Sequence, residues 1–383
     1  MIEKALTGGK NYWLWLAFLS SLTFLGLLSY LKQLEVGLGI TGMSRNVSWG
    51  LYIANFTFFV GVAASAVMLV IPYYLHGKNE YSRIMIFAEF LAVVSVFVAL
   101  LFVLVDLGRP DRLFNVILFP SPKSLLFWDM LVLTGYLILN LILGWKACEA
   151  EKREIEQPYW TKILVYISIP WAISIHTVTA FIYCGLSARP FWFSALLAPR
   201  FLATAFVSGP AILLIFCLAL KRFAGFDPGQ NALENLRKTV TYALSVHIFF
   251  FLVEFFTVFY SDHPEHVKPF RYMLFGYEGH YHLVAFSWIS LFVAVFSFFI
   301  LMSGNFLYKR KLAFFILTML IFGIWLDKGL ILMVAGFNPT PEVELEKYMP
   351  TFPETIITIG IWSLGTLTLS LLTNIALQIK KSI

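Results

Sequence analysis

The sequence predicts an all-α integral membrane protein with ten transmembrane helices. Of its 383 residues, 59% are hydrophobic, 17% are aromatic and only 13% are charged, whereas a soluble domain carries roughly 25% charged residues. This composition leaves too little polar surface to cover a water-exposed globule. A helix needs about 20 apolar residues to span the hydrocarbon layer of a membrane. Polar or proline-bearing breaks separate ten runs of about this length.

The ten predicted spans follow one another along the whole chain. Their limits are 12–31, 49–75, 82–105, 124–147, 160–186, 199–221, 239–260, 280–303, 311–334 and 355–378. The first run has no small-residue cleavage site, so we expect a membrane span and not a removable signal peptide. A closed β-barrel is excluded because the sequence lacks ten-residue segments of alternating hydrophobicity.

We expect the helices to form two four-helix bundles, spans 2–5 and spans 6–9, with spans 1 and 10 flanking them. The expected units are residues 1–48 (first helix and loop), 49–186 (first bundle), 199–334 (second bundle) and 335–383 (loop and tenth helix). A weak internal repeat supports two related bundles, because the pattern FxxGxA occurs at 58–63 and again at 206–211. Small residues at such spacing let helices approach closely, so ordinary helix packing is the alternative explanation.

Lysine and arginine are distributed unequally between the two sides of the predicted bundle. Ten spans place both termini on one side, and 17 of the 28 Lys and Arg residues fall there, against 11 on the other side. The positive-inside rule therefore predicts cytoplasmic termini in the cell inner (cytoplasmic) membrane. The long proline-bearing segments 261–279 and 335–354 then face outward. We expect lids or docking surfaces there, and plain solvated loops are an equal alternative.

Charge and cysteine patterns exclude several classes of protein. The net charge of +6 is scattered through short loops, so no basic stripe for nucleic acid is present. Cys148, Cys184 and Cys217 lie in or beside apolar runs without CxxC or His-rich spacing, which argues against a metal cluster and a disulfide framework. Haem held by two histidines is disfavoured, because His176 and His247 lie on opposite sides of the membrane's middle.

A few polar side chains of the first bundle lie inside the predicted spans, where an ionisable group costs a few kcal/mol. These candidates are Asn55, Glu89, Asp129 and His176. Three of them lie toward the outer half and Glu89 lies slightly inward of the middle. A structural hydrogen bond is an equal explanation for His176. In DLGRPDR, we interpret Asp106 and Arg109 as a helix-ending turn with a salt bridge.

The second bundle has its own ionisable residues, His247, Glu254, Asp327 and Lys328. His247 and Glu254 are two helical turns apart on one face, so they could be a structural pair joined through a third group. Asp327 and Lys328 are adjacent and therefore point in different directions. Because they close span nine near its outer end, an interfacial position is the alternative to a functional one.

Six segments together resemble one family of membrane proteins. They are WGLYIANFTFFVGVAASA at 49–66, LVDLGRPDR at 104–112, PSPKSLLFWD at 120–129, RFLATAFVSGPA at 200–211, WLDKGLILMVAGFNPTP at 325–341 and YMPTFPETIITIGIWSLG at 348–365. The first four resemble the NrfD and polysulfide reductase membrane subunits. The last two resemble the ten-span branch of that family, which includes the HmcC-like and DsrP-like subunits of anaerobic respiratory complexes. The DsrP-like subunits, which are linked to sulfite reduction, are the closest expectation.

This resemblance implies a membrane subunit of a menaquinol-linked oxidoreductase complex that carries no haem or iron-sulfur cluster of its own. It implies that menaquinol or menaquinone binds in the first bundle near the outer face. Electrons would then be exchanged with an extracytoplasmic iron-sulfur subunit of ferredoxin type. The further partners that the resemblance implies are a haem-b membrane subunit, a multihaem cytochrome c and a cytoplasmic iron-sulfur subunit, with no role for nucleic acid.

The family pattern assigns quinone-site roles to Asn55, Asp129 and His176, and a place on a proton route to Glu89. Quinol oxidation releases two electrons and two protons. A histidine and a buried carboxylate can each accept a proton, whereas an asparagine can hold a quinone carbonyl without titrating. The aromatic residues expected to line the ring and tail site are Trp49, Tyr52 and Trp128. The expected proton route also includes His247, Glu254, Asp327 and Lys328.

A secondary transporter or an ion channel is the alternative class, because ten spans and a two-bundle repeat are also natural there. A purely structural anchor is a third class. A transporter should move its substrate when it is reconstituted alone, whereas a quinone-linked subunit should purify with iron-sulfur or haem partners.

Overall fold

The computed structural model describes residues 2–71, 73, 79–155, 157–303, 306–338, 345 and 347–380. Within these residues, ten helices are long and apolar enough to cross a membrane. The one β-type contact among them is an isolated bridge between Tyr277 and His280. The predicted fold class and the predicted number of spans are therefore confirmed.

The helices are α1 (Lys10–Val36), α2 (Leu51–Val62), α3 (Val67–Val70), α4 (Met85–Asp106), α5 (Asn115–Leu118), α6 (Leu125–Arg153), α7 (Tyr159–Cys184), α8 (Leu197–Ala219), α9 (Gln230–Ser261), α10 (Pro264–Leu274), α11 (Val284–Leu301), α12 (Arg310–Trp325), α13 (Leu332–Phe337) and α14 (Phe352–Lys380). A 3₁₀ turn, η3 (Ala63–Ser65), joins α2 to α3. A π-helical segment, η9 (Leu326–Ile331), joins α12 to α13.

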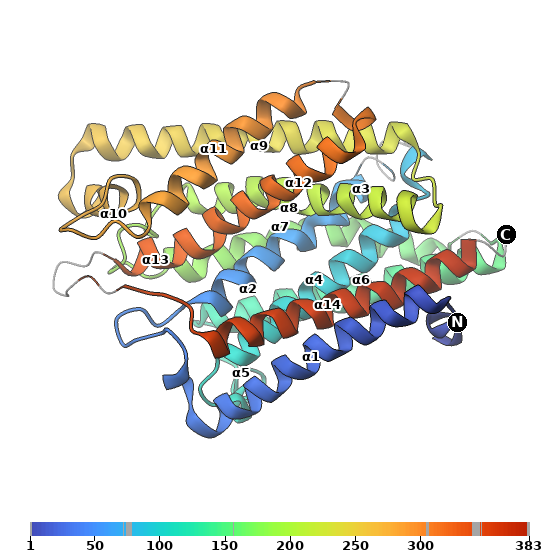
Figure 1. Cartoon of the computed structure of the whole chain (residues 1–383), viewed down its shortest axis with the longest axis horizontal. Coiled ribbons are helices and arrows are strands. Elements are labelled where there is room, and N and C mark those ends of the chain that lie inside the picture. The colour runs from blue at the N-terminus through green and yellow to red at the C-terminus, as the bar shows by residue number, and fades with distance from the viewer. Residues whose placement is uncertain are drawn as a thin grey trace.

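The long helices lie in two groups of four (Figure 1). In the first group, α2 packs on α4, α4 on α6 and α6 on α7. In the second group, α8 packs on α9 and α12, and α11 packs on α9 and α12. The groups meet where α2 and α7 pack on α8 and where α2 packs on η9. We call them the first bundle and the second bundle.

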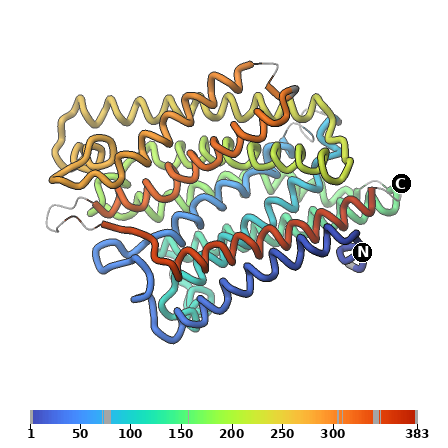
Figure 2. Tube along the Cα trace, viewed as in Figure 1, coloured from blue at the N-terminus to red at the C-terminus, as the bar shows by residue number. Residues whose placement is uncertain are grey.

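The first and last membrane helices form a pair of their own. Figure 2 shows α1 and α14 running side by side along one edge of the molecule. Gly26 and Gly360 allow this approach, since a Cβ atom on Gly26 would lie 2.6 Å from the Cα atom of Gly360. Beyond α1, α14 also packs on α4 and α6 of the first bundle.

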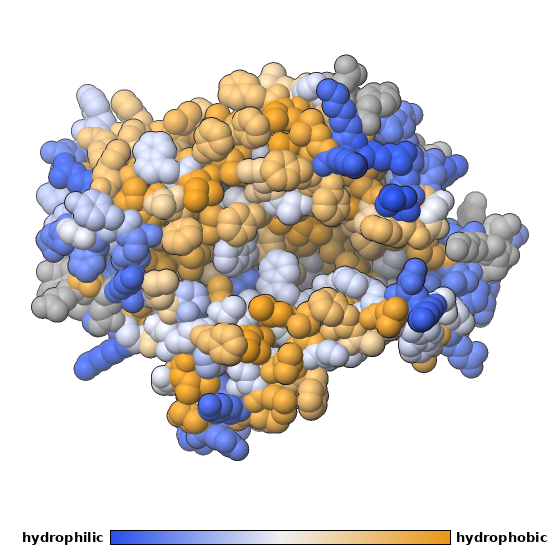
Figure 3. Space-filling model, viewed as in Figure 1, coloured by the Kyte–Doolittle hydropathy of each residue, from blue (hydrophilic) through white to orange (hydrophobic). Residues whose placement is uncertain are grey.

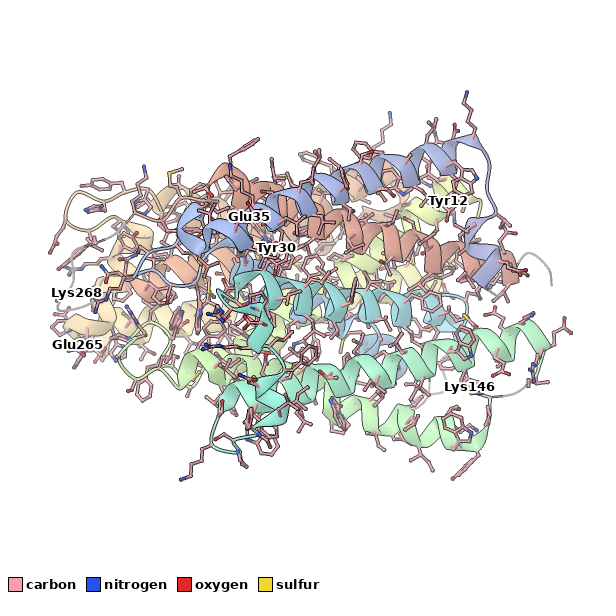
Figure 4. All side chains as sticks on the ribbon, turned by 90° about the horizontal axis from the view of Figure 1, so that it is seen from below. Tyr12, Tyr30, Glu35, Lys146, Glu265 and Lys268 are labelled. Atoms are coloured by element: carbon pink, nitrogen blue, oxygen red, sulfur yellow. The ribbon has the colours of Figure 1, made fainter. Side chains whose placement is uncertain are left out.

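Both chain ends lie at the same end of the molecule, and α10 lies at the opposite end (Figure 1). We call these the terminal end and the α10 end. Figure 3 shows a wide apolar band between two hydrophilic ends, as expected for a protein whose middle contacts lipid. In Figure 4, Tyr12 and Lys146 lie toward the terminal end, whereas Tyr30 and Glu35 lie toward the α10 end.

Two long connections were predicted to face outward, and the structure describes one of them completely and the other in part. The segment predicted over 261–279 contains α10, which starts with a proline in its first turn. Val267, Phe270 and Met273 repeat every three residues and are buried, whereas Glu265 and Lys268 are the labelled polar residues of α10 in Figure 4. This segment is therefore packed and is not a plain solvated loop. In the segment predicted over 335–354, residues 339–344 and 346 lie outside the described residues.

The boundary of one span differs clearly from the predicted one. The helix predicted over 239–260 begins nine residues earlier, at Gln230. Its first turns carry Arg237 and Lys238, and such charged residues do not count toward an apolar run. The helix therefore begins before the apolar segment from which it was predicted.

The repeated FxxGxA pattern lies where the two bundles touch. A Cβ atom on Gly61 of α2 would lie 3.6 Å from Ala205 of α8, and one on Gly209 of α8 would lie 2.9 Å from the backbone nitrogen of Ser65. Each glycine thus faces the helix that carries the other copy of the pattern, or the turn that follows that helix. Small residues at both places let the two bundles approach closely.

Candidate functional site

One face of α7 carries three buried polar side chains, His176, Thr179 and Tyr183. Their spacing of three and four residues places them one above another on a helix. His176 lies about 12 Å along the helix from Cys184, the last residue of α7, at 1.5 Å per residue. This face looks into the first bundle, because α7 packs there on α6 and α3.

Asp129 of α6 meets this face from the neighbouring helix. Its Oδ1 atom accepts a hydrogen bond of 2.6 Å from the Thr179 hydroxyl. Asp129 is buried four residues after the start of α6, so it lies about 6 Å from the α10 end of that helix. Helices α6 and α7 therefore bring together Asp129 and His176, which lies one turn before Thr179.

The His176 ring differs from its polar neighbours in its hydrogen bonding. Neither ring nitrogen has a hydrogen-bond partner in the described part of the chain, although the side chain is fully buried. Buried polar atoms are nearly always hydrogen-bonded in native proteins, because an unpaired one costs about 1–3 kcal/mol. The alternative from the sequence, a hydrogen bond to a neighbouring group of the protein, is therefore wrong for the described residues. The ring is free to bond a ligand or a water molecule.

An aromatic cluster closes the α10 end of this region. Tyr183 shares a hydrogen bond of 2.6 Å with Thr57 of α2. The Trp49 ring packs edge-on against Tyr183 at 5.6 Å between centroids and also packs against Trp192 and Phe337. Trp49 thus belongs to an aromatic cluster at this end of the molecule.

Two other predicted wall residues lie elsewhere. The Tyr52 hydroxyl donates a hydrogen bond of 2.7 Å to Gln33 of α1, on another side of α2. Trp128 is 42% exposed, and its indole nitrogen donates to the Pro122 carbonyl. Tyr52 and Trp128 therefore bond groups outside the cluster around Trp49.

Asn55 is buried and already bonded. Its Oδ1 atom accepts hydrogen bonds from the indoles of Trp325 and Trp362, at 3.0 and 2.9 Å. Its amide nitrogen donates to the Leu51 carbonyl. Asn55 therefore joins α2 to α12 and α14, and its carbonyl is not open to a ligand in this structure.

Asp106 is the last residue of α4, where the sequence predicts a turn held by a salt bridge to Arg109. The helix does end there, but the salt bridge joins Arg109 to Asp111 at 3.1 Å, whereas the buried Oδ1 atom of Asp106 has no partner within the described residues. The Asp106 carboxylate interacts electrostatically with both Tyr52 and Tyr183. Because this buried oxygen is unpaired, we add Asp106 to the candidate site. In the sequence, the signal for this role was the acidic residue at the start of DLGRPDR.

Glu354 was not predicted from the sequence. This fully buried carboxylate accepts hydrogen bonds from the backbone nitrogens of Leu51 and Gly42 and from the Tyr348 hydroxyl. A carboxylate at the first residue of α2 satisfies a free N–H group and complements the helix dipole. Burial and the nearby Glu354 carboxylate raise the pKa of Tyr348. Tyr348 therefore keeps its proton and holds the segment before α14 against the start of α2.

The second bundle contains a network of buried ion pairs. Arg200 of α8 donates to Glu254 of α9 at 2.9 Å and to Asp327 of η9 at 2.7 Å. The His247 ring lies 3.7 Å from the second carboxylate oxygen of Asp327. Glu254 and His247 are thus linked through two groups, Arg200 and Asp327, where the sequence suggested one. The role of Arg200 was missed from the sequence because this residue stands second in its predicted span.

Lys328 follows Asp327 but points elsewhere, as predicted. Its ammonium donates to the Phe201 carbonyl at 3.2 Å and lies 4.7 Å from the centre of the Phe201 ring. The side chain is only 2% exposed. The interfacial alternative for this residue is therefore wrong.

Glu89 lies far from the α10 end, 17 residues before Asp106 on α4, which corresponds to about 26 Å. It is buried, and its Oε2 atom has no partner in the described structure. That atom would lie 3.6 Å from a Cβ atom on Gly144 of α6. A groove at the terminal end is lined by Met85 and Ile86, about one turn before Glu89.

The described residues contain no group of three or more His, Cys, Asp or Glu side chains placed to hold a metal ion. The three cysteines lie apart and are free thiols.

Comparisons with known proteins match this architecture to one family. The family model described as polysulphide reductase, NrfD, matches residues 39–338, which include both bundles but neither α1 nor α14. A dimethyl sulfoxide reductase membrane subunit of Halobacterium salinarum is 31% identical over 62% of this chain and 58% of its own length. A selenate reductase subunit of Mesobacillus selenatarsenatis is 27% identical over 69% of each protein.

A third relative is the Hdr-like menaquinol oxidoreductase integral membrane subunit of Archaeoglobus fulgidus, which is 23% identical over 64% of this chain and 60% of its own length. The chain therefore aligns with roughly three fifths to two thirds of these relatives. Because the family model covers well over half of the residues, this multi-pass membrane protein belongs to the NrfD polysulphide reductase family.

Proposed function

We propose that this protein is the quinone-interacting membrane subunit of a respiratory oxidoreductase complex. It exchanges electrons between menaquinol or menaquinone, bound in the first bundle near the α10 end, and an iron-sulfur subunit docked at that end. The observation that carries this proposal is the fully buried His176 ring, whose two nitrogens have no partner among the described residues, beside the buried Asp129 carboxylate. Family membership and the menaquinol oxidoreductase relative support the choice of substrate.

The polar groups in this region suit the chemistry of a quinol. A quinol has two hydroxyl groups, and each must transfer a proton when the ring is oxidised. A neutral histidine nitrogen and an ionised carboxylate both accept hydrogen bonds and protons. In the proposal, His176 accepts one proton and Asp129 or the unpaired Asp106 accepts the other. The two electrons pass to a metal cluster of the partner subunit. Trp49 and Tyr183 supply the aromatic contacts to the ring.

The structure changes the role that we propose for Asn55. Both indole nitrogens that bond its carbonyl come from helices outside the first bundle. A quinone oxygen accepts hydrogen bonds, so it could bond only the Asn55 amide nitrogen, which already donates one hydrogen bond to the Leu51 carbonyl. We therefore propose that Asn55 fixes α2 against α12 and α14 and does not hold the quinone.

We also propose that protons leave toward the terminal end, which the positive-inside rule assigns to the cytoplasm. Glu89 is a buried, unpaired carboxylate in that half of the first bundle, and a groove opens about one turn away from it. His247, Glu254, Asp327 and Lys328 form the second part of the proposed route. The link to sulfite reduction, through a DsrP-like complex with haem-b, cytochrome c and cytoplasmic iron-sulfur partners, is proposed from the sequence resemblance alone.

The proposal is tested by labelling the purified complex with a photoreactive naphthoquinone and mapping the labelled peptides. We expect labels on α2, α6 and α7, and we expect His176→Gln to reduce them. The control is Thr177→Val, because the Thr177 hydroxyl bonds the backbone of its own helix. Labelling confined to the second bundle, or unchanged labelling in His176→Gln, would contradict the proposal. Transport of a solute by the subunit reconstituted alone would favour the transporter alternative.

A further inference from the structure

Lys328 occupies the place where the two bundles meet. Its segment, η9, packs against α2 so closely that a Cβ atom on Gly329 would lie 3.0 Å from the Ala54 carbonyl oxygen. The ammonium itself would lie 2.9 Å from a Cβ atom on Gly61 of α2. Since Gly61 has no side chain, the lysine can extend to the first bundle. A π-helical segment in a long helix is a frequent mark of a functional site.

The charges around Lys328 are balanced but not all paired. Arg200 bonds both Glu254 and Asp327, whereas the hydrogen bond found for Lys328 goes to a backbone carbonyl. Two cations and two carboxylates therefore share one buried cluster, in which Arg200 is the cation directly paired to the acids. A small cavity lined by Arg200, Asp327 and Lys328 lies beside the ammonium. Lys328 can therefore move its charge by small changes of its flexible side chain.

Lys328 also reaches the first bundle. The Phe201 ring beneath its ammonium packs against Tyr183 of α7 at 5.7 Å between centroids, on the helix face that carries His176. The ammonium is thus placed for its charge to act on His176 as well as on His247 and Asp327. The Asp129 carboxylate is bonded to Thr179, one turn from His176 on the same helix. In an apolar interior, a second positive charge near Lys328 is far more costly than it would be in water.

We propose that Lys328 is the charged link between the two bundles, a positioning residue through which the ion-pair network of the second bundle responds to the charge state of His176. This inference rests on the proposed function. When His176 accepts a quinol proton, the new positive charge repels the ammonium toward Asp327 and the adjoining cavity. No covalent bond to Lys328 forms or breaks. The second bundle thus senses a reaction that occurs in the first.

The test is a set of double-mutant cycles on the rate of quinol oxidation by the assembled complex. The variants are His176→Gln, Asp327→Asn, Lys328→Met and their combinations. We expect the effects of His176→Gln and Asp327→Asn to be non-additive by about fivefold, as contacting or networked residues are. In the Lys328→Met background this coupling should disappear. Additive effects with Lys328 present, or coupling that persists without it, would overturn the inference.

A second variant displaces the charge without removing it. Gly61→Ala adds a methyl group against the ammonium, and we expect it to weaken the coupling between His176 and Asp327 at least twofold. Ser208→Ala is the matched control, because its hydroxyl lies 3.1 Å from the same point but carries no charge. Equal effects of the two variants would also overturn the inference. An inactive wild-type complex would refute the proposed function itself, whereas an active complex with additive cycles refutes only the link.

Discussion

The buried polar groups of the two bundles differ in their bonding partners. In the first bundle, atoms of Glu89, Asp106 and His176 are buried without a partner in the described part of the chain. In the second bundle, the His247 Nδ1 atom and the Ser297 hydroxyl are also unpaired among the described residues, but both buried carboxylates, Glu254 and Asp327, are bonded by Arg200 in a closed ion-pair network. A closed network can serve structure alone, whereas unpaired groups keep their hydrogen-bonding capacity for something that binds. This difference favours ligand chemistry in the first bundle and charge balance in the second.

The largest expected effect is the loss of the network's central cation. Arg200→Met leaves two buried carboxylates without their partner, so we expect the free energy of unfolding to fall by about 3 kcal/mol or more. Thermal unfolding followed with a thiol-reactive dye measures this, because Cys148 and Cys217 are buried in the folded protein. The control is Arg109→Met, which removes an exposed pair and should leave the melting temperature unchanged. Equal stability of both variants would show that the network is dispensable.

The next effect concerns activity and not stability. Replacing the unbonded ring in His176→Gln breaks no protein hydrogen bond, so the melting temperature should stay within about 2 °C of wild type. We expect kcat/KM for quinol oxidation to fall about a hundredfold, the usual worth of a positioned proton acceptor. Stopped-flow kinetics of the purified complex checks this. If unfolding and turnover changed together, His176 would be a structural residue, and the contrast between the bundles would weaken.

A smaller effect separates bonded from unbonded polar groups within the first bundle. Asn55→Ala leaves two buried indole N–H groups without an acceptor, which should cost about 2 kcal/mol of stability. Trp362→Phe removes one of these donors together with its bond and provides the comparison. Quinol turnover per folded complex should change by less than about threefold in Asn55→Ala. A large loss of turnover in a stable Asn55→Ala variant would restore the quinone-binding role for Asn55.

The smallest expected change in rate is at Glu89. Glu89→Gln keeps the shape of the side chain, so quinol oxidation should stay within about twofold of wild type, because Glu89 lies beside Gly144, about 22 Å along α6 from Asp129. The number of protons moved per electron should fall in proteoliposomes that carry the complex. An unchanged ratio would remove Glu89 from the proposed proton route.

The sequence was sufficient for what depends on composition and spacing. Apolar run lengths predicted all ten spans, and the cost of burying polar groups in lipid pointed to His176, Asp129 and Glu89. It was insufficient where tertiary contacts decide. Whether Asn55 is bonded or free depends on two tryptophans that are 270 and 307 residues away along the chain. Helix α10 was not predicted, because its charged residues and prolines interrupt the short repeat of apolar residues.

The pairing of charged residues also depends on tertiary contacts that the sequence does not show. The sequence analysis placed Asp106 and Arg109 in one turn, but Arg109 pairs with Asp111, which is nearer to it along the chain. Arg200 stood at the edge of a predicted span, so its burial could be known only after α9 and η9 were packed against α8. Glu354 lay one residue before its predicted span, although it secures the start of α2. Boundaries of helices are where pattern-based reasoning is least accurate.

The contact between Gly26 and Gly360 joins two membrane helices, α1 and α14, that are far apart along the chain. During synthesis, α1 enters the bilayer long before α14 exists, and it must wait in lipid while some 300 residues are inserted. Because lipid tails solvate an apolar helix as well as protein does, this delay costs little. Helix α14 then completes two interfaces at once, with α1 and with the first bundle. A chain cut short before residue 352 would accordingly insert most of these spans yet leave α1 without its partner.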